Sequence, residues 1–152
     1  MEEQLKPMRN LYLDDVRTPP KNREWAFVAR RVEDAKQYCL EAGCADMISF
    51  DHDMGGVETE FGFICDPTGM DFAKWLVEED QNRGGTFIPM HFRFHVHSSN
   101  PSGAANIQSL LDGYLTHRKR ELETHINHCN QGLYEGSCKY GEPTCPALRE
   151  QL

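Results

Sequence analysis

Short apolar segments alternate with amphipathic ones along the 152 residues of the chain. Strands are predicted where short apolar or alternating runs are bounded by turn-forming residues, at 10–13, 25–30, 47–50 and 91–97. Helical spacing of apolar residues predicts helices at 32–42, from 68 to about 82 and from 100 onward, with a glycine-containing polar loop at about 54–67. This alternation predicts an α/β fold with an open parallel sheet of four to five strands.

Two of the predicted helices have recognisable starts. Thr68 is followed three residues later by Asp71, and Asn100 is followed by Pro101. The last helix carries an apolar stripe that gives way to charged residues beyond His117. We therefore divide the chain into a domain at 1–124 and a C-terminal tail at 125–152.

Composition places the chain among globular proteins. Hydrophobic residues make up 39% of it, and no apolar run approaches the roughly 18 residues that span a bilayer. The sequence opens with Glu2 and Glu3, acidic residues where a signal peptide needs basic ones, and no apolar central region follows. We expect a cytoplasmic protein with no membrane partner, in the host cytoplasm if the gene belongs to a phage.

The formal charge of -8 argues against a duplex DNA partner, because such binding depends on basic side chains that neutralise phosphates. An anionic substrate would therefore need groups close to its binding site that attract negative charge. A metal ion, a helix N-terminus or a few histidines can each provide this attraction.

Three of the predicted strands end in ionisable residues. Asp14 and Asp15 follow the first, Asp51, His52 and Asp53 follow the third, and His97 and Ser98 close the last. In open parallel sheets ligands bind outside the carboxyl ends of the strands. We expect these residues to meet at one edge, although up to 84 positions separate them.

Clustered carboxylates repel one another unless a cation or a proton compensates. The candidate metal ligands are Asp14, Asp15, Asp51 and Asp53, which favour Mg²⁺ or Mn²⁺. Histidine ligation would shift the preference toward Mn²⁺ or Zn²⁺. The alternative is that these acids cap turns or helices, and it weighs most for Asp53, which lies before two glycines.

His95 and His97 are two apart on a predicted strand and face the same side of the sheet. One imidazole could take a proton from an attacking water while the other gives one to a leaving alkoxide. The alternative is a histidine hydrogen-bonded in the core. His52 is a candidate metal ligand or second proton carrier. Ser98 and the helix start at Asn100 could hold a phosphate, unless Asn100 and Pro101 are only an ordinary helix start.

The tail carries further candidate metal ligands. His125, Cys129, Cys138 and Cys145 could form a structural Zn²⁺ site that ties the tail to the long helix. Their spacing is not that of a standard zinc knuckle. Free thiols are the alternative.

Five motifs in order resemble the cyclic-phosphate-processing receiver-like domain family, over roughly residues 9–112. They are Leu13-Asp14-Asp15-x-Arg17-x-Pro19, the Trp25 strand, Ser49-Phe50-Asp51-His52-Asp53-Met54-Gly55, Thr68-Gly69-x-Asp71 and His95-x-His97-Ser98-x-Asn100-Pro101-x-Gly103. Each piece is common by itself. The ordered set is what makes the resemblance specific.

The resemblance implies a divergent receiver (flavodoxin-like) fold in which Asp51 occupies the phosphoacceptor position. It also implies an enzyme, a metal-assisted phosphoesterase for cyclic phosphates. His97, His95, Asp51 and His52 would be catalytic, and Arg17, Ser98, Asn100 and Gly103 would contact substrate. The substrate would be a 2′,3′-cyclic phosphate RNA end or a cyclic nucleotide, in RNA repair or in phage counter-defence.

Two other functions remain open at this point. A module with the same pocket could sequester a cyclic nucleotide without cutting it. A receiver-like interaction domain could accept a phosphoryl group on Asp51. Phosphorelay signalling is disfavoured, because no strand is predicted after Gly103 to carry the lysine that receivers place on their last strand.

Overall fold

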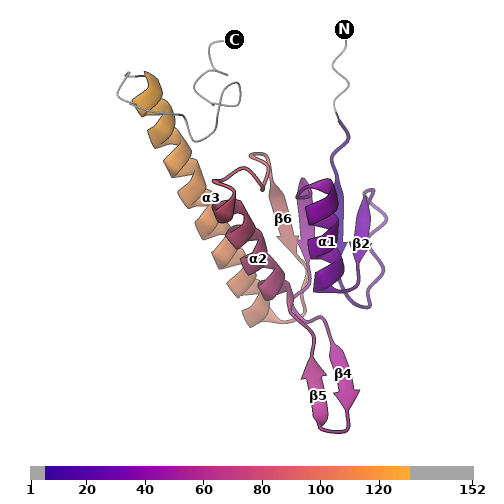
Figure 1. Ribbon diagram of the computed structural model, residues 1–152. Helices are drawn as coiled ribbons and strands as arrows, with labels where there is room; N and C mark the ends of the chain where they lie inside the picture. The colour runs from indigo at the N-terminus through magenta and orange to yellow at the C-terminus, as the bar shows by residue number, and fades with distance from the viewer. Residues whose placement is uncertain (1–5, 131–152) are drawn as a thin grey trace.

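The computed structural model describes residues 6–130, and its centre is a parallel sheet (Figure 1). Four strands form it in the order β2-β1-β3-β6, all parallel. They are β1 (Asn10–Leu13), β2 (Phe27–Ala29), β3 (Met47–Phe50) and β6 (Arg93–Val96). The predicted open parallel sheet flanked by helices is thereby confirmed.

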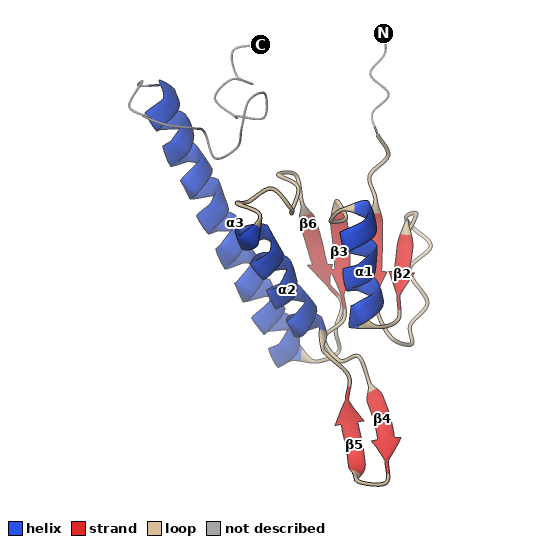
Figure 2. Ribbon diagram, in the orientation of Figure 1, coloured by secondary structure: helices blue, strands red, loops and turns tan. Residues whose placement is uncertain are grey.

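One face of this sheet carries the core. Leu11, Leu13, Ile48 and Phe50 lie on it in register and are completely buried. Three helices supply the other half of the core: α1 (Val32–Ala42), α2 (Gly69–Asn82) and α3 (Pro101–Asn130). Figure 2 shows α1 in front of the sheet, running roughly along the strands. Burial of these side chains is the main stabilising term of the fold.

The opposite face is covered differently. The connections from β1 to β2 and from β2 to β3 run in opposite directions across the sheet. Because connections between parallel strands are right-handed, these two lie on opposite faces of the sheet. Residues 14–26 make the second connection without a helix. Trp25 from this loop packs edge-on against Tyr12, with ring centroids 5.0 Å apart. Ser49 and His95, neighbours in register, lie on the same face as Tyr12.

The predicted helix starts are present. Thr68 and Asp71 form a complete capping box at the start of α2. The side chain of Asn100 accepts a hydrogen bond from the backbone N–H of Gly103 at 2.9 Å, as an N-cap residue does. Both caps lie beside the carboxyl edge of the sheet, so they fix where the chain leaves that edge.

The prediction of a loop at 54–67 is wrong. The structure has an antiparallel hairpin there, β4 (Gly56–Thr59) and β5 (Gly62–Cys65), which projects beyond the edge of the sheet (Figure 1). Phe61, Phe63 and Ile64 are exposed. The burial-driven alternation that identifies a strand from sequence is absent where neither face is buried, and this explains the error.

The long helix α3 is attached to the body by a buried ionic network. The carboxylate of Asp80 is fully buried and accepts hydrogen bonds from the hydroxyl of Tyr114 at 2.6 Å and from Arg118 at 3.1 Å. It also accepts from the backbone N–H groups of Phe87 and Ile88. The predicted domain boundary at residue 124 falls inside α3, which continues to Asn130.

Replacing Asp80 with alanine should lower the free energy of unfolding by about 3–5 kcal/mol, because it leaves the Arg118 guanidinium buried without its counter-ion. Urea denaturation would measure the loss. Asp112→Asn is the control. Asp112 is exposed on α3, the helix that carries Arg118, and its replacement should change the free energy of unfolding by no more than about 0.5 kcal/mol. Equal losses in the two variants would show that the network does not hold α3.

Candidate functional site

Three carboxylates meet at the carboxyl edge of the sheet. Asp14 and Asp15 follow β1 and Asp51 follows β3, and one oxygen from each lies within 4.8 Å of the others. Asp14 is completely buried and Asp51 is 5% exposed. We call these three residues the acid cluster. They are brought together because β1 and β3 are paired and end at the same level.

Backbone amides hold the buried carboxylate of Asp14. Its Oδ1 accepts hydrogen bonds from the N–H groups of Val16 at 2.9 Å and Arg17 at 2.7 Å. Burial acts to raise the pKa of Asp14, but these two N–H groups and the hydrogen bond to His97 outweigh it, so the pKa lies below its usual value. Asp14 is therefore ionised at neutral pH.

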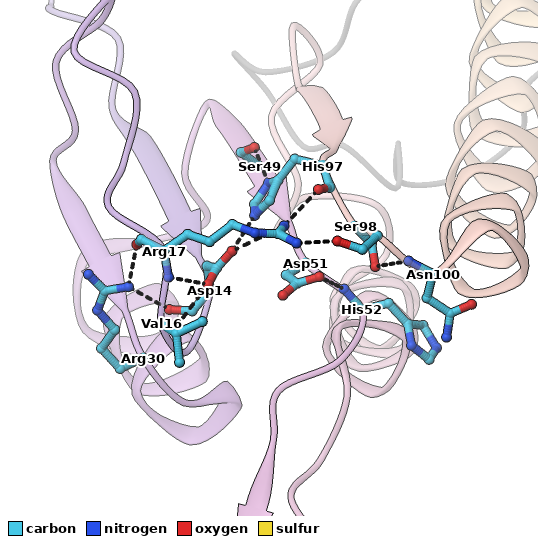
Figure 3. A network of polar contacts seen from close by, with 11 residues as sticks. Asp14, Val16, Arg17, Arg30, Ser49, Asp51, His52, His97, Ser98 and Asn100 are labelled. Atoms are coloured by element: carbon cyan, nitrogen blue, oxygen red, sulfur yellow. Dashed lines mark hydrogen bonds and ion pairs between the residues drawn. The ribbon is translucent and has the colours of Figure 1, made fainter.

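His97 is hydrogen-bonded through both ring nitrogens. Nε2 lies 2.9 Å from Oδ2 of Asp14, and Nδ1 lies 2.8 Å from the hydroxyl of Ser49 (Figure 3). The ring stacks on Tyr12 with centroids 4.6 Å apart. Burial lowers the pKa of His97 although Asp14 opposes the shift. A neutral imidazole beside an ionised Asp14 donates from Nε2 and accepts the Ser49 hydroxyl at Nδ1.

Arg17 joins the two sides of the edge. It extends toward the segment that carries His97 and Ser98 (Figure 3). Its guanidinium donates to the carbonyl of His97 at 2.9 Å and to the hydroxyl of Ser99, and lies 3.6 Å from Asp14. In this structure the expected substrate residue Arg17 therefore holds the loops together and places one positive charge beside the acid cluster.

His52, Asp53 and Asn100 form a second group. Nδ1 of His52 lies 2.7 Å from Asp53, and the amide of Asn100 donates to the same carboxylate at 3.3 Å. A Cβ on Gly103 would lie 2.3 Å from the His52 ring, so only glycine permits this packing. The candidate metal ligand Asp53 is outside the acid cluster. This group joins the loop after β3 to the start of α3.

The remaining candidates are placed as follows. His95 is exposed and, within residues 6–130, shares no hydrogen bond with Asp14 or His97, so the structure does not bring the two histidines into one contact. The hydroxyl of Ser98 accepts from the N–H of Asn100 at 3.1 Å. Of the zinc candidates, His125 is buried in α3. The side chain of Cys129 and the whole of Cys138 and Cys145 lie outside the described residues.

Sequence reasoning gave too little weight to Ser49 and Tyr12, the two residues that hold the His97 ring. Ser49 is 4% exposed and is the polar residue between buried Ile48 and Phe50. Such a residue on a buried strand must find a hydrogen-bond partner. That signal was available in the sequence, but the identity of the partner, 48 positions away, was not.

The donor set of the acid cluster suits a hard divalent cation. Carboxylate oxygens at this spacing are the ligands that Mg²⁺ and Mn²⁺ prefer. Gly55 supports the arrangement, because a Cβ there would lie 2.8 Å from Oδ2 of Asp15. Among the described residues, Arg17 and His97 are the basic side chains that pair with the cluster, both through Asp14. Three carboxylates therefore face one guanidinium and one imidazole, and the cluster carries excess negative charge.

Comparison with known families now adds to this geometry. A family model described as the cyclic-phosphate processing receiver domain matches residues 9–113. The chain belongs to this family. The match runs from the start of β1 into α3, so the receiver domain includes every residue of the acid cluster, His97 and the hairpin. No match was found among the curated proteins or among the solved structures.

Gly55→Ala should weaken Mn²⁺ binding about 10-fold or more, because the added methyl group displaces the Asp15 carboxylate. Gly62→Ala is a matched control. Both glycines have positive φ, 75° and 116°, so both variants carry backbone strain of about 1–2 kcal/mol, but a Cβ on Gly62 meets no atom within 4 Å. Titration calorimetry with Mn²⁺ compares them. Equal affinities in the two variants would remove Asp15 from the metal site.

Proposed function

We propose that this receiver domain is a metal-assisted phosphodiesterase that opens cyclic phosphates. The observation that carries the proposal is the hydrogen bond between His97 and Asp14, which places a titratable ring directly beside the acid cluster. The family's description as cyclic-phosphate processing supports the substrate class. The predicted catalytic role of Asp51 is kept in the proposal, in which Asp51 would be a ligand of the metal ion.

Asp14, Asp15 and Asp51 would hold Mg²⁺ or Mn²⁺, which supplies polarisation of the phosphoryl oxygens. The start of α3, beside Ser98 and Asn100, would face the non-bridging oxygens, because the positive end of the helix dipole favours negative charge there. The bound cation and the positive end of α3 would together offset the negative charge of the cluster where the anionic substrate binds.

His97 would carry the proton. With Asp14 holding the cation, the tautomer of His97 that keeps its hydrogen on Nδ1 and donates it to the Ser49 hydroxyl would leave Nε2 as the proton acceptor beside the cluster. As its oxygen forms a bond to phosphorus, the attacking water would give a proton to this Nε2. The P–O bond of the ring then breaks, and the same imidazole protonates the leaving alkoxide. The expected sharing of this work with His95 is left out of the proposal, because His95 does not contact His97 or Asp14. His52 takes a positioning role through Asp53.

The substrates proposed are 2′,3′-cyclic phosphate RNA ends and cyclic nucleotides. Such a reaction would suit RNA repair or phage counter-defence, in the cytoplasm. None of the helices in the described region has the length and apolar character needed to cross a membrane.

His97→Ala should lower ring opening by at least about 100-fold, the smaller end of what a proton carrier contributes. Asp51→Asn should lower it by at least as much, because it removes one of the three carboxylates that would hold the metal. The assay is ³¹P NMR with Mg²⁺ or Mn²⁺ and a panel of 2′,3′-cyclic mononucleotides, cyclic-phosphate-ended RNA and cyclic dinucleotides. Asp112→Asn should retain full activity.

Three results would redirect the proposal. If no ring opens with either metal while a cyclic nucleotide still raises the melting temperature, the domain sequesters its ligand. A mass gain of one phosphoryl group on Asp51 from acetyl phosphate would indicate a phosphoacceptor instead. Ring opening that survives His97→Ala would leave the metal site as the whole catalyst.

A further inference from the structure

A hollow of about 190 Å³ opens on the face of the sheet that the helices leave uncovered. It belongs neither to the acid cluster nor to the core. Its lining comes from the loop before β2 and from the middle of β3 and β6, and includes Asn22, Arg23, Trp25, Met47, Ser49 and His95.

The lining has a distinct chemical character. Trp25 and His95 contribute two flat rings, while Asn22 and Ser49 contribute an amide and a hydroxyl. Arg23 supplies the charged side chain of the lining, which contains no carboxylate among the described residues. In a chain of formal charge -8, this surface is locally neutral to basic. Such a surface suits an aromatic ligand with polar edges rather than a metal ion.

Trp25 is held in place before any ligand arrives. Its Nε1–H donates to the carbonyl of Pro20 at 2.9 Å, its edge packs against Tyr12, and the Arg23 guanidinium lies 5.8 Å from its ring centroid. A ring already fixed in this way loses little conformational entropy on stacking.

The hollow is connected to the proposed catalytic edge. Ser49 lines the hollow and bonds one nitrogen of His97, whose other nitrogen bonds Asp14. One imidazole ring therefore separates the hollow from the acid cluster. A phosphate at the cluster and a group in the hollow would therefore bind on the two sides of the bonded pair His97 and Ser49.

We propose that the hollow binds the nucleobase of the cyclic nucleotide or RNA end, stacked on Trp25 and His95. This assignment rests on the proposed function, since it gives a place to the part of the substrate that the acid cluster does not contact. Aromatic rings with an adjacent arginine are the surfaces on which proteins stack unpaired bases. The small volume fits one base rather than a whole nucleotide, for which typical ligand pockets are larger.

The first experiment uses Trp25 as the reporter and needs no catalysis. The chain has two tryptophans, and Trp75 is partly buried at the edge of the core, where it packs against Phe72 and Phe87. Trp75→Phe therefore leaves Trp25 as the only indole. Ribonucleosides and 2′,3′-cyclic mononucleotides should quench its fluorescence in a saturable way. Glycerol 1,2-cyclic phosphate, which has no base, should not.

In the same background His95→Ala should weaken nucleoside binding about 10-fold, as expected when one stacking ring is lost. His117→Ala is the control, because His117 is an exposed histidine of α3 outside this hollow. Absence of saturable quenching by every base-bearing probe, or equal affinity in the His95→Ala and His117→Ala proteins, would overturn the proposal.

The second experiment separates base recognition from catalysis. His95→Ala should lower the ratio of kcat/KM for the cyclic mononucleotide to kcat/KM for glycerol 1,2-cyclic phosphate about 10-fold. If no ring opens on any substrate while nucleosides still quench Trp25, the base site stands and the proposed hydrolysis fails. If rings open with an unchanged ratio and no quenching, the hydrolysis stands and the base site fails.

Discussion

The buried carboxylate of Asp14 is the constraint on which the site depends. A fully buried charge is unfavourable unless hydrogen bonds and counter-charges surround it, and here the amides of Val16 and Arg17, the Arg17 guanidinium and His97 do so. Satisfying this one group draws the segment after β6 over the end of β1. The position of His97, and with it the geometry of the proposed catalytic edge, follows from that need.

The uneven distribution of helices gives the two halves of the proposed substrate separate places. Because residues 14–26 cross the second face as a loop, that face keeps a hollow that a helix would fill. The phosphate chemistry stays at the strand ends, where parallel sheets bind ligands. The loop thus does two things at once: its first residues supply carboxylates, and its last ones supply the aromatic wall.

Local signals in the sequence predicted most of the fold and part of the site. Acids at strand ends, the Thr68 cap and the Asn100 cap depend on neighbours a few residues away, and each was found. The hairpin was missed because its strands bury neither face. The pairing of His95 with His97 was inferred from the two-residue period of a strand, but β6 ends at Val96. Even so, His97 stacks on Tyr12 and bonds Ser49, so its ring lies on the same face of the sheet as His95. What the period could not predict is that His97 turns toward β1, where it bonds Asp14, while His95 stays exposed.

The chain also departs from a signalling receiver at the point where charge is balanced. In such receivers a lysine on the last strand faces the phosphoacceptor, whereas here residues 101–130 form one helix directly after the β6 loop. Arg17 lies beside Asp14, and its guanidinium donates hydrogen bonds to the His97 carbonyl and the Ser99 hydroxyl. A phosphorylated Asp51 would consequently add negative charge to a cluster that the described residues leave undercompensated. A divalent cation would relieve that excess, in agreement with the metal-dependent chemistry proposed above for a transient substrate.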